Sequence, residues 1–235
     1  MAGRRQIHQI YISEKRISQR IRKLIALAES NRMPVRYVSS ETIRSILKTD
    51  NHQGIGAEVS PYPFVDLNRL LVTFKEDADA PLLLLLDHIV DPQNMGGLIR
   101  TASCAGVNGV IIPKDRSASP TPAVSRASAG ALEHIPITQV TNLVGTIRTL
   151  KEKGIWIIGL DQAADNPIFL SDVSGPIALV VGGEEKGIRS LVRQKCDMLV
   201  SIPQTGRIDS LNASAAGAVA MYEIFRQRQY AFARK

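Results

Sequence analysis

The chain has 235 residues, 44% of them hydrophobic, and its mean hydropathy is −0.01. This length allows one large domain or two modest ones with apolar cores. No stretch approaches the ~18 apolar residues of a membrane span, and the basic N-terminal residues lack the continuous apolar core of a secretory signal. Composition therefore argues against a membrane protein and indicates a cytoplasmic one.

Cysteine and histidine usage fits this location. Cys104 and Cys196 lie in apolar-periodic contexts without the spacing of metal ligands. We expect both to be reduced, buried thiols, with no disulfide framework. The four histidines are scattered along the chain, so we expect no metal site.

The net charge of +7 is confined to one part of the chain. Residues 1–50 hold 11 Lys and Arg against 4 Asp and Glu, while the remaining residues hold 18 of each sign. A basic module joined to a neutral body suggests an arm that binds a polyanion, and nucleic acid first of all. Charge alone favours equally a second interpretation, the solvated face of the amphipathic helix expected over 14–30.

Residues 1–62 predict a small α/β domain. The expected elements are strands over 7–13 and 34–39 and helices over 14–30 and 39–47. Gly54 and Gly56 lack the third glycine of a dinucleotide-binding fingerprint. Residues 63–80, which contain the acidic run KEDADA, are the expected linker.

Residues 81–235 alternate apolar strands with helices. We expect strands over 82–89, 109–113, 155–161, 177–184 and 198–203, and helices over 94–106, 142–154, 186–195 and from about 211 onward. Continuous apolar strands separated by helices indicate a parallel sheet that is covered on both faces. In such a sheet, ligands bind beyond the carboxyl ends of the strands.

Unusual residues follow three of these strands. After the first, Asn94 precedes two glycines, and Arg100 follows about two turns later. After the second, Gly182 and Gly183 allow a close approach to the backbone, and Glu184 comes next.

The third stretch, IPQTGRIDSLNASAAGA, opens the last helix with small residues. Ser210 and Asn212 flank Leu211 there. Each feature has a simpler explanation: Asn94 or Ser210 as a helix cap, the glycine pair as a turn. Their occurrence at three strand ends of one sheet instead favours a shared ligand site. Since no P-loop or dinucleotide motif is present, spacing alone leads to an α/β enzyme with a glycine-lined pocket.

The three stretches resemble the signature motifs of the SpoU/TrmH family of RNA ribose 2′-O-methyltransferases, in the SPOUT superfamily. The matching residues are Asn94, Gly96 and Arg100; Gly182, Glu184 and Gly187; and Ile202, Pro203, Gly206, Ser210, Leu211, Asn212 and Ser214. The resemblance covers 81–228. In the first domain, HQGIGAEV resembles a segment of the L30e-like RNA-binding domain of 23S rRNA guanosine 2′-O-methyltransferases. The further strand-helix unit usual at the start of that domain has no counterpart, so we expect a shortened domain.

The resemblance implies a SPOUT-type parallel sheet with a C-terminal trefoil knot, preceded by a small L30e-like domain. It implies S-adenosyl-L-methionine as the cofactor, bound largely by backbone groups. The expected cofactor-binding residues are Gly182, Gly183, Ile202, Leu211 and Ser214. Apolar side chains would cover the faces of the adenine, and glycines would let the backbone approach it.

The essential residues of the family map to Asn94, Arg100, Glu184, Ser210 and Asn212. A guanidinium is always protonated, so Arg100 is better suited to gripping a phosphate and stabilising a developing alkoxide than to acting as a base. Glu184 could orient Arg100 or accept the proton. Ser210 and Asn212 could bind the ribose or hold the arginine.

The resemblance also implies a homodimer, in which the last helix either forms the subunit interface or packs within the subunit. Methylation of a guanosine in 23S rRNA is the first hypothesis for function. A tRNA ribose 2′-O-methyltransferase is the second. A non-catalytic RNA-binding or assembly protein is the third, and the presence of all five essential residues argues against it.

Overall fold

The computed structural model describes residues 3–14, 17–74, 80–206 and 210–231. The chain divides into two units, Met1–Pro63 and Phe64–Lys235. Each unit has a sheet of its own. The chain therefore has an α/β architecture in two parts, as the sequence predicts.

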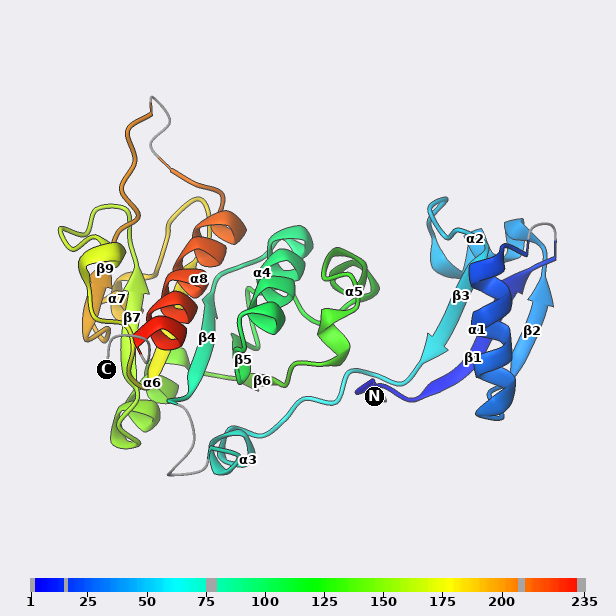
Figure 1. Ribbon diagram of the computed structural model, residues 1–235, viewed down its shortest axis with the longest axis horizontal. Coiled ribbons are helices and arrows are strands. Elements are labelled where there is room, and N and C mark those ends of the chain that lie inside the picture. The colour runs from blue at the N-terminus through cyan, green and yellow to red at the C-terminus, as the bar shows by residue number, and fades with distance from the viewer. Residues whose placement is uncertain (1–2, 15–16, 75–79, 207–209, 232–235) are drawn as a thin grey trace. The chain divides into compact units, whose positions relative to one another are not determined.

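The first unit is a three-stranded sheet in the order β2-β1-β3 with two helices (Figure 1). Its elements are β1 (Ile7–Ser13), α1 (Gln19–Ser30), β2 (Val35–Val38), α2 (Ser40–Leu47) and β3 (Ile55–Val59). Strand β1 pairs parallel to β2 and antiparallel to β3. Helix α1 begins later than residue 14 because Ser18 caps it, accepting a hydrogen bond from Ile21 N.

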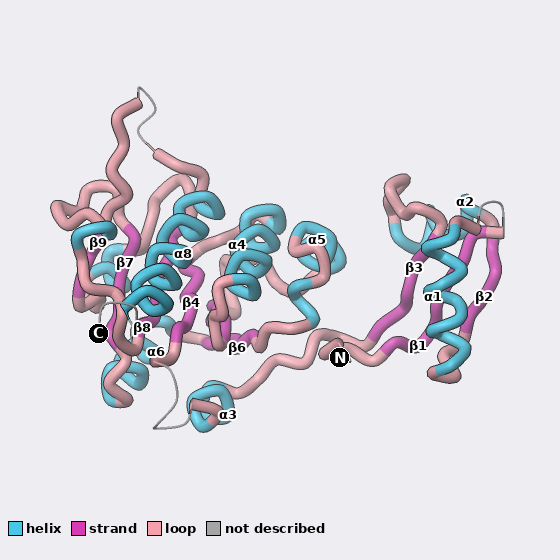
Figure 2. The backbone as a smooth tube through the Cα atoms, viewed as in Figure 1, coloured by secondary structure: helices cyan, strands magenta, loops and turns pink. Residues whose placement is uncertain are grey.

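The second unit is a six-stranded parallel sheet in the order β6-β5-β4-β8-β7-β9, with helices around it (Figure 2). Its elements are α3 (Leu67–Val72), β4 (Leu82–Asp87), α4 (Pro92–Cys104), β5 (Gly109–Pro113), α5 (Pro122–Ala127), the 3₁₀ helix η1 (Ala131–Glu133), β6 (Ile137–Val140), α6 (Leu143–Glu152), β7 (Trp156–Leu160), the 3₁₀ helix η2 (Ile168–Leu170), β8 (Ile177–Gly182), α7 (Ser190–Arg193), β9 (Met198–Val200) and α8 (Ala213–Ala231).

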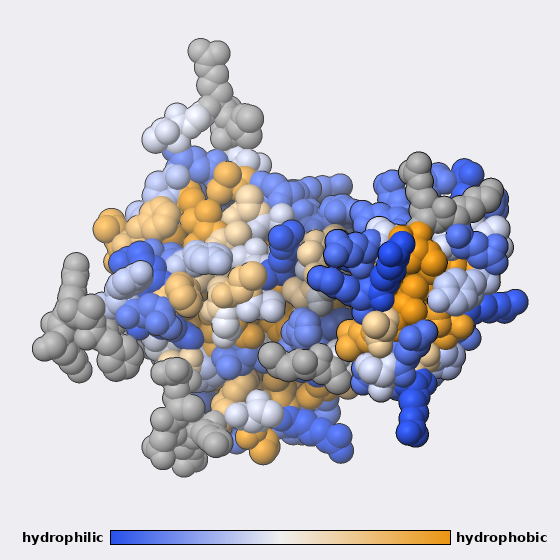
Figure 3. All heavy atoms as spheres, turned by 45° about the vertical axis from the view of Figure 1, so that its right-hand side comes forward, coloured by the Kyte–Doolittle hydropathy of each residue, from blue (hydrophilic) through white to orange (hydrophobic). Residues whose placement is uncertain are grey.

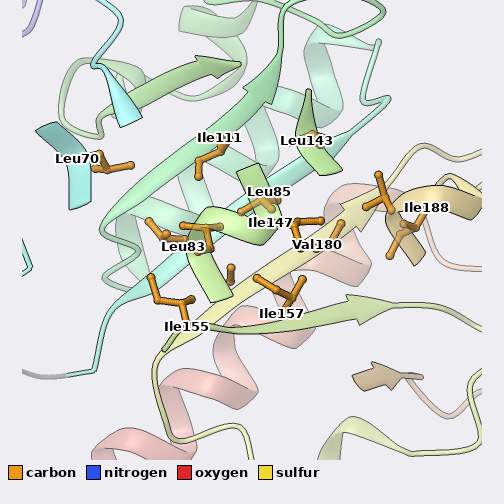
Figure 4. Packing of buried hydrophobic residues seen from close by; sticks show 13 residues of the cluster. Leu70, Leu83, Leu85, Ile111, Leu143, Ile147, Ile155, Ile157, Val180 and Ile188 are labelled. Carbon is orange, nitrogen blue, oxygen red and sulfur yellow. The ribbon is translucent and has the colours of Figure 1, made fainter. Parts of the chain in front are cut away.

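The five leucines of β4 explain why this sheet is buried on both faces. Because successive side chains alternate between faces, Leu83 and Leu85 pack with Ile147 of α6 in one cluster (Figure 4). Leu82, Leu84 and Leu86 point the other way and are also fully buried. Helices α4 and α8, which contact each other closely, lie side by side in Figure 1. A Cβ at Gly217 of α8 would lie 2.3 Å from Leu98 Cδ2 of α4, so the glycine permits this close approach.

Four elements depart from the expected pattern. Within the expected linker, α3 buries Leu70 in the core of the second unit, and Val65 N bonds to Ile137 O of β6. Neither α5 nor β6 was expected from the sequence; β6 is a four-residue strand at the sheet edge. The helix expected over 186–195 is reduced to α7, because residues 183–188 form a tight loop.

The two thiols differ from each other. Cys104 is exposed, so the expectation that both cysteines are buried is wrong for this residue at the end of α4. Cys196 is half-buried beneath β7, and burial raises the pKa of its thiol to about 11. Cys196 therefore stays protonated at neutral pH.

The surface of each unit mixes polar side chains with exposed apolar ones. Figure 3 shows hydrophobic patches separated by hydrophilic surface on the face that it draws. Leu27 in the first unit and Leu170 in the second are 60% and 84% exposed. None of the described helices combines the length and apolar composition needed to cross a bilayer.

Candidate functional site

Three side chains from three separate strand ends meet at the carboxyl edge of the larger sheet. Asn94 Nδ2 donates to Glu184 Oε1 at 3.0 Å, and Asn212 Nδ2 donates to Asn94 Oδ1 at 2.8 Å. Asn212 Nδ2 also donates to Glu184 Oε1. The fold thus brings together residues that are 90 and 118 positions apart. We call Asn94, Glu184 and Asn212 the polar triad.

Asn212 directly precedes helix α8. Its Oδ1 accepts from Ser214 N at 2.9 Å and from Ala215 N at 3.3 Å, so Asn212 is the N-cap. The simpler explanation of Ser210 as the helix cap is therefore wrong, because Ser210 is exposed and lies two residues before Asn212. One end of the Asn212 amide therefore caps α8, and the other end joins the polar triad.

Helix α4 begins with a different cap. Asp91 accepts from Gln93 N at 3.1 Å and from Asn94 N at 3.4 Å. The interpretation of Asn94 as a cap is therefore wrong. Its side chain, only 7% exposed, points into the polar triad instead. A buried amide keeps such a place only when its donor and acceptor are both satisfied, as they are here.

Gly182, the last residue of β8, and Gly183 after it let the backbone pack closely on itself. A Cβ at Gly182 would lie 2.1 Å from the carbonyl carbon of Gly187, and one at Gly183 would lie 2.6 Å from His88 O. Gly183 O accepts from Gly187 N at 2.8 Å, and Gly187 has a φ of 60°. These contacts leave no space for larger residues. The loop 183–189, which carries Glu184, is therefore held tightly.

A cavity of about 370 Å³ opens on one side of this loop. Six of the expected site residues line it: Gly182, Gly183, Glu184, Ile202, Ser210 and Leu211. Ser214 is not among the lining residues; its hydroxyl donates to Asn212 Oδ1 at 2.6 Å, which places it behind the polar triad.

The same cavity has a charged pair that the sequence analysis missed. Asp161 and Arg193 both line it, and Arg193 Nε lies 2.8 Å from Asp161 Oδ2. Asp161 directly follows β7, so a polar residue at the end of an apolar strand was the available signal. It belongs to the same pattern as the three stretches that were recognised.

A second cavity, of about 420 Å³, opens on the other side of the loop. Asn94, Glu184, His88 and Arg116 are among its lining residues. Residues 183–187 line both cavities, so this loop is the wall between them. Neither His88 nor Arg116 belongs to a motif in the sequence. Both residues have a left-handed backbone, with φ of 61° and 55°, and no sequence motif predicted this conformation.

Arg100 stays apart from the polar triad. It is exposed on α4, and it forms no hydrogen bond with the three side chains of the polar triad. Six residues after Asn94, it lies on another face of the helix, next to Gly97 one turn earlier. A Cβ at Gly97 would lie 3.1 Å from Ser214 Cβ, so this face of α4 borders the beginning of α8. Among the described residues, no cluster of three His, Cys, Asp or Glu could hold a metal ion.

Comparisons with known proteins agree with this arrangement. The SpoU rRNA Methylase family matches residues 81–222, and a family described as RNA 2'-O ribose methyltransferase substrate binding matches residues 1–65. The chain is 40% identical to the 23S rRNA (guanosine-2'-O-)-methyltransferase RlmB of Pseudomonas putida, over 96% of this chain and 90% of that protein. The RlmB of Shewanella oneidensis is 39% identical, over 95% of this chain and 90% of its own length.

A solved structure shares the fold. The SpoU methyltransferase AviRb from Streptomyces viridochromogenes, in complex with the cofactor AdoMet, matches with a TM-score of 0.80 and 26% identity, over 96% of this chain and 84% of that one. The expected SPOUT-type parallel sheet behind a small α/β domain is therefore confirmed. With a family match across the larger unit and relatives near 40% identity over nearly the whole length, this chain belongs to the SpoU rRNA methylase family.

Proposed function

We propose that this protein transfers a methyl group from S-adenosyl-L-methionine to the ribose 2′-hydroxyl of a guanosine in 23S rRNA. The polar triad carries this proposal: three polar side chains from separate strand ends meet at the wall between two cavities. The RlmB relatives, named for this reaction, support the choice of substrate.

The cavity of about 370 Å³ fits the proposed cofactor in size, since small-molecule sites commonly span about 300–1,000 Å³. Main-chain groups at Ile202 and Leu211 would bind the adenine, with Gly182 and Gly183 forming the floor. Ser214 lies outside the lining, so we assign it the support of Asn212 through its 2.6 Å hydrogen bond. When bound, the cofactor supplies a methyl group on a positively charged sulfonium.

The residues of this chain orient the hydroxyl and take up its charge. Glu184 Oε1 accepts from the amides of Asn94 and Asn212, which fixes the carboxylate. We propose that its other oxygen orients the ribose hydroxyl and accepts its proton as the oxygen–methyl bond forms. Exposed Arg100 grips the neighbouring phosphate, and Ser210, in the cavity lining, holds the ribose.

The first unit would hold the RNA. Arg20, Arg22 and Lys23 of α1 and Arg36 of β2 are exposed, and they account for part of the basic surplus of residues 1–50. Exposed cations neutralise phosphates without reading sequence. An RNA-binding domain over 1–62, a linker over 63–80 and a methyltransferase domain over 81–235 are part of this proposal.

We further propose a homodimer that works in the cytoplasm, where ribosomal subunits assemble. The support for a dimer lies on α8, where Val219 and Tyr222 are 36% and 49% exposed. Ala215 is exposed and Ala218 is half-buried on the same helix. Apolar side chains left exposed on a long helix are suited to packing against a second copy.

Transfer of a tritiated methyl group from S-adenosyl-L-methionine tests the proposal. We expect label in 23S rRNA and, after mapping, a blocked 2′ position on one guanosine. Label in tRNA alone would put the tRNA hypothesis first. An absence of transfer to any RNA, together with no cofactor binding by calorimetry, would favour the non-catalytic RNA-binding protein.

A further inference from the structure

Both ends of the loop 183–189 are fastened to a single residue, Asp87, the last residue of β4. Its carbonyl oxygen accepts from Gly183 N at 3.0 Å, where the loop begins. Its carboxylate accepts from Arg189 N at 2.8 Å and from Arg189 Nε at 2.7 Å, where the loop ends. Asp87 thus closes the loop on the end of a neighbouring strand.

Packing does not explain a carboxylate at this position. Asp87 follows five leucines and is 0% exposed, so its charge lies entirely out of water. Burying a carboxylate is costly unless hydrogen bonds and an opposite charge compensate for it. The backbone and guanidinium of Arg189 provide both, and the Arg189 side chain remains 43% exposed.

The fastened loop is the one that presents Glu184 to the polar triad and separates the two cavities. Its first residue lies close to the residue that follows β4, since a Cβ added at Gly183 would lie only 2.6 Å from His88 O. Its last residue is held by the Asp87 carboxylate. The position of Glu184 therefore depends on contacts at both ends of the loop.

We propose that Asp87 is a positioning residue for methyl transfer: by clamping Arg189 it holds the loop 183–189, and with it Glu184, in the geometry that binds the cofactor and orients the hydroxyl. Asp87 lines neither cavity and touches no reacting group. Its role in catalysis rests on the proposed function. Its role in ordering the loop does not.

The test compares Asp87→Asn with a matched control, Asp197→Asn. Asp197 likewise accepts from a backbone N–H, Ile157 N at 2.8 Å, and pairs with a cation, Lys151 Nζ at 2.7 Å. Asp197 directly precedes β9, so it lies at the amino ends of the parallel strands, whereas the loop 183–189 lies at their carboxyl ends. Asp197 lines neither cavity. Asp87 is fully buried and Asp197 is 31% exposed, so the melting temperature of each variant is measured and both are assayed in the folded state.

Hydrogen–deuterium exchange of the cofactor-free chain measures loop order directly. We expect Asp87→Asn to speed exchange of the amides of Gly183, Gly187 and Arg189, and Asp197→Asn to leave them unchanged. Below the melting temperature of each variant, Asp87→Asn should also raise the Kd for S-adenosyl-L-methionine roughly tenfold and lower kcat roughly 10- to 100-fold. The control should retain wild-type values.

Unchanged exchange in the loop would overturn the clamp, whether or not the protein has methyltransferase activity. Faster exchange with an unaltered Kd and kcat, or an equal loss in Asp197→Asn, would overturn the positioning role. If Asp87→Asn does not fold, Arg189→Met tests the same contact, because it removes the Nε donor from a side chain that is partly exposed. This variant should show the same faster exchange, higher Kd and lower kcat. Failure of the wild-type chain to bind cofactor would instead contradict the proposed function. Hydrogen–deuterium exchange of the loop would still test the contact between Asp87 and Arg189.

Discussion

Asn212 Nδ2 lies 2.8 Å from Asn94 Oδ1, and this hydrogen bond joins the beginning of α8 to the first turn of α4. The other end of the same amide caps α8 through Ser214 N and Ala215 N. A single side chain thus performs a structural task with its oxygen and a task in the candidate site with its nitrogen. The two tasks can be separated by substitution.

Asn212→Ser should separate them. Serine is nearly as good an N-cap as asparagine, so we expect the free energy of unfolding to fall by at most about 1 kcal/mol. A serine hydroxyl cannot span to Asn94 and Glu184, so methyl transfer should fall roughly 10- to 100-fold. Denaturant unfolding and tritiated-methyl transfer measure the two effects. A variant with wild-type activity would reduce Asn212 to a helix cap.

Ala216→Leu should obstruct the cofactor cavity without unfolding the helix. Ala216 lines the cavity, whereas its neighbour Ala215 is exposed, so Ala215→Leu is a control with the same change in helix propensity. Because Ala215 lies on the helix face proposed for the dimer, light scattering first checks that both variants keep the mass of the wild type. Overpacking of this kind costs about 1–3 kcal/mol, which corresponds to a roughly 5- to 150-fold rise in the Kd for S-adenosyl-L-methionine. Calorimetry on both variants checks this. Equal affinities would mean that the small residues of α8 have no role in binding.

Arg100→Ala should abolish activity while leaving the fold intact. Arg100 is exposed, so stability should change by less than about 0.5 kcal/mol, and cofactor affinity should stay at the wild-type value. Loss of the phosphate grip should lower kcat roughly 100-fold or more. Arg100→Lys keeps the charge but loses the planar pair of donors, and should recover only part of the activity. Full activity in Arg100→Ala would remove this residue from the site.

Glu223→Gln should change how stability depends on pH. Hydrogen bonds from Arg226, at 2.7 and 2.8 Å, lower the pKa of Glu223 below its usual 4.5, helped by Gln227 and opposed by burial. A folded pKa below the unfolded one means that the charged pair stabilises the protein above about pH 4.5. That stabilisation is lost as the pH falls through the lower folded pKa.

The variant should therefore be less stable than the wild type by roughly 1 kcal/mol near neutral pH. The difference should shrink steadily under acidic conditions. Thermal unfolding of both proteins at a series of pH values measures it. A difference that does not vary with pH would show that the hydrogen bonds, and not the charge of Glu223, stabilise this turn of α8.

Local pattern determined much of this protein. The five leucines of β4 indicated a buried strand, which the structure shows, and the stretches after three strands indicated the edge where the candidate site lies. The residues 94, 184 and 212 were all recognised from that pattern. The pattern did not predict the short edge strand β6 or helix α3. Four or six residues are too few for hydrophobic periodicity to identify an element without its packing partners.

Tertiary structure alone decided what each of those residues does. Asn94 is in the polar triad because Asp91 caps α4, and Ser210 is not the cap of α8 because Asn212 is. Gly182 and Gly183 line the cavity and also let the backbone pack closely on itself. The clamp from Asp87 to Arg189 spans 102 residues. These hydrogen bonds depend on which donor lies near which acceptor, and that depends on the order of the strands in the sheet. The spacing of residues in the sequence does not determine the strand order.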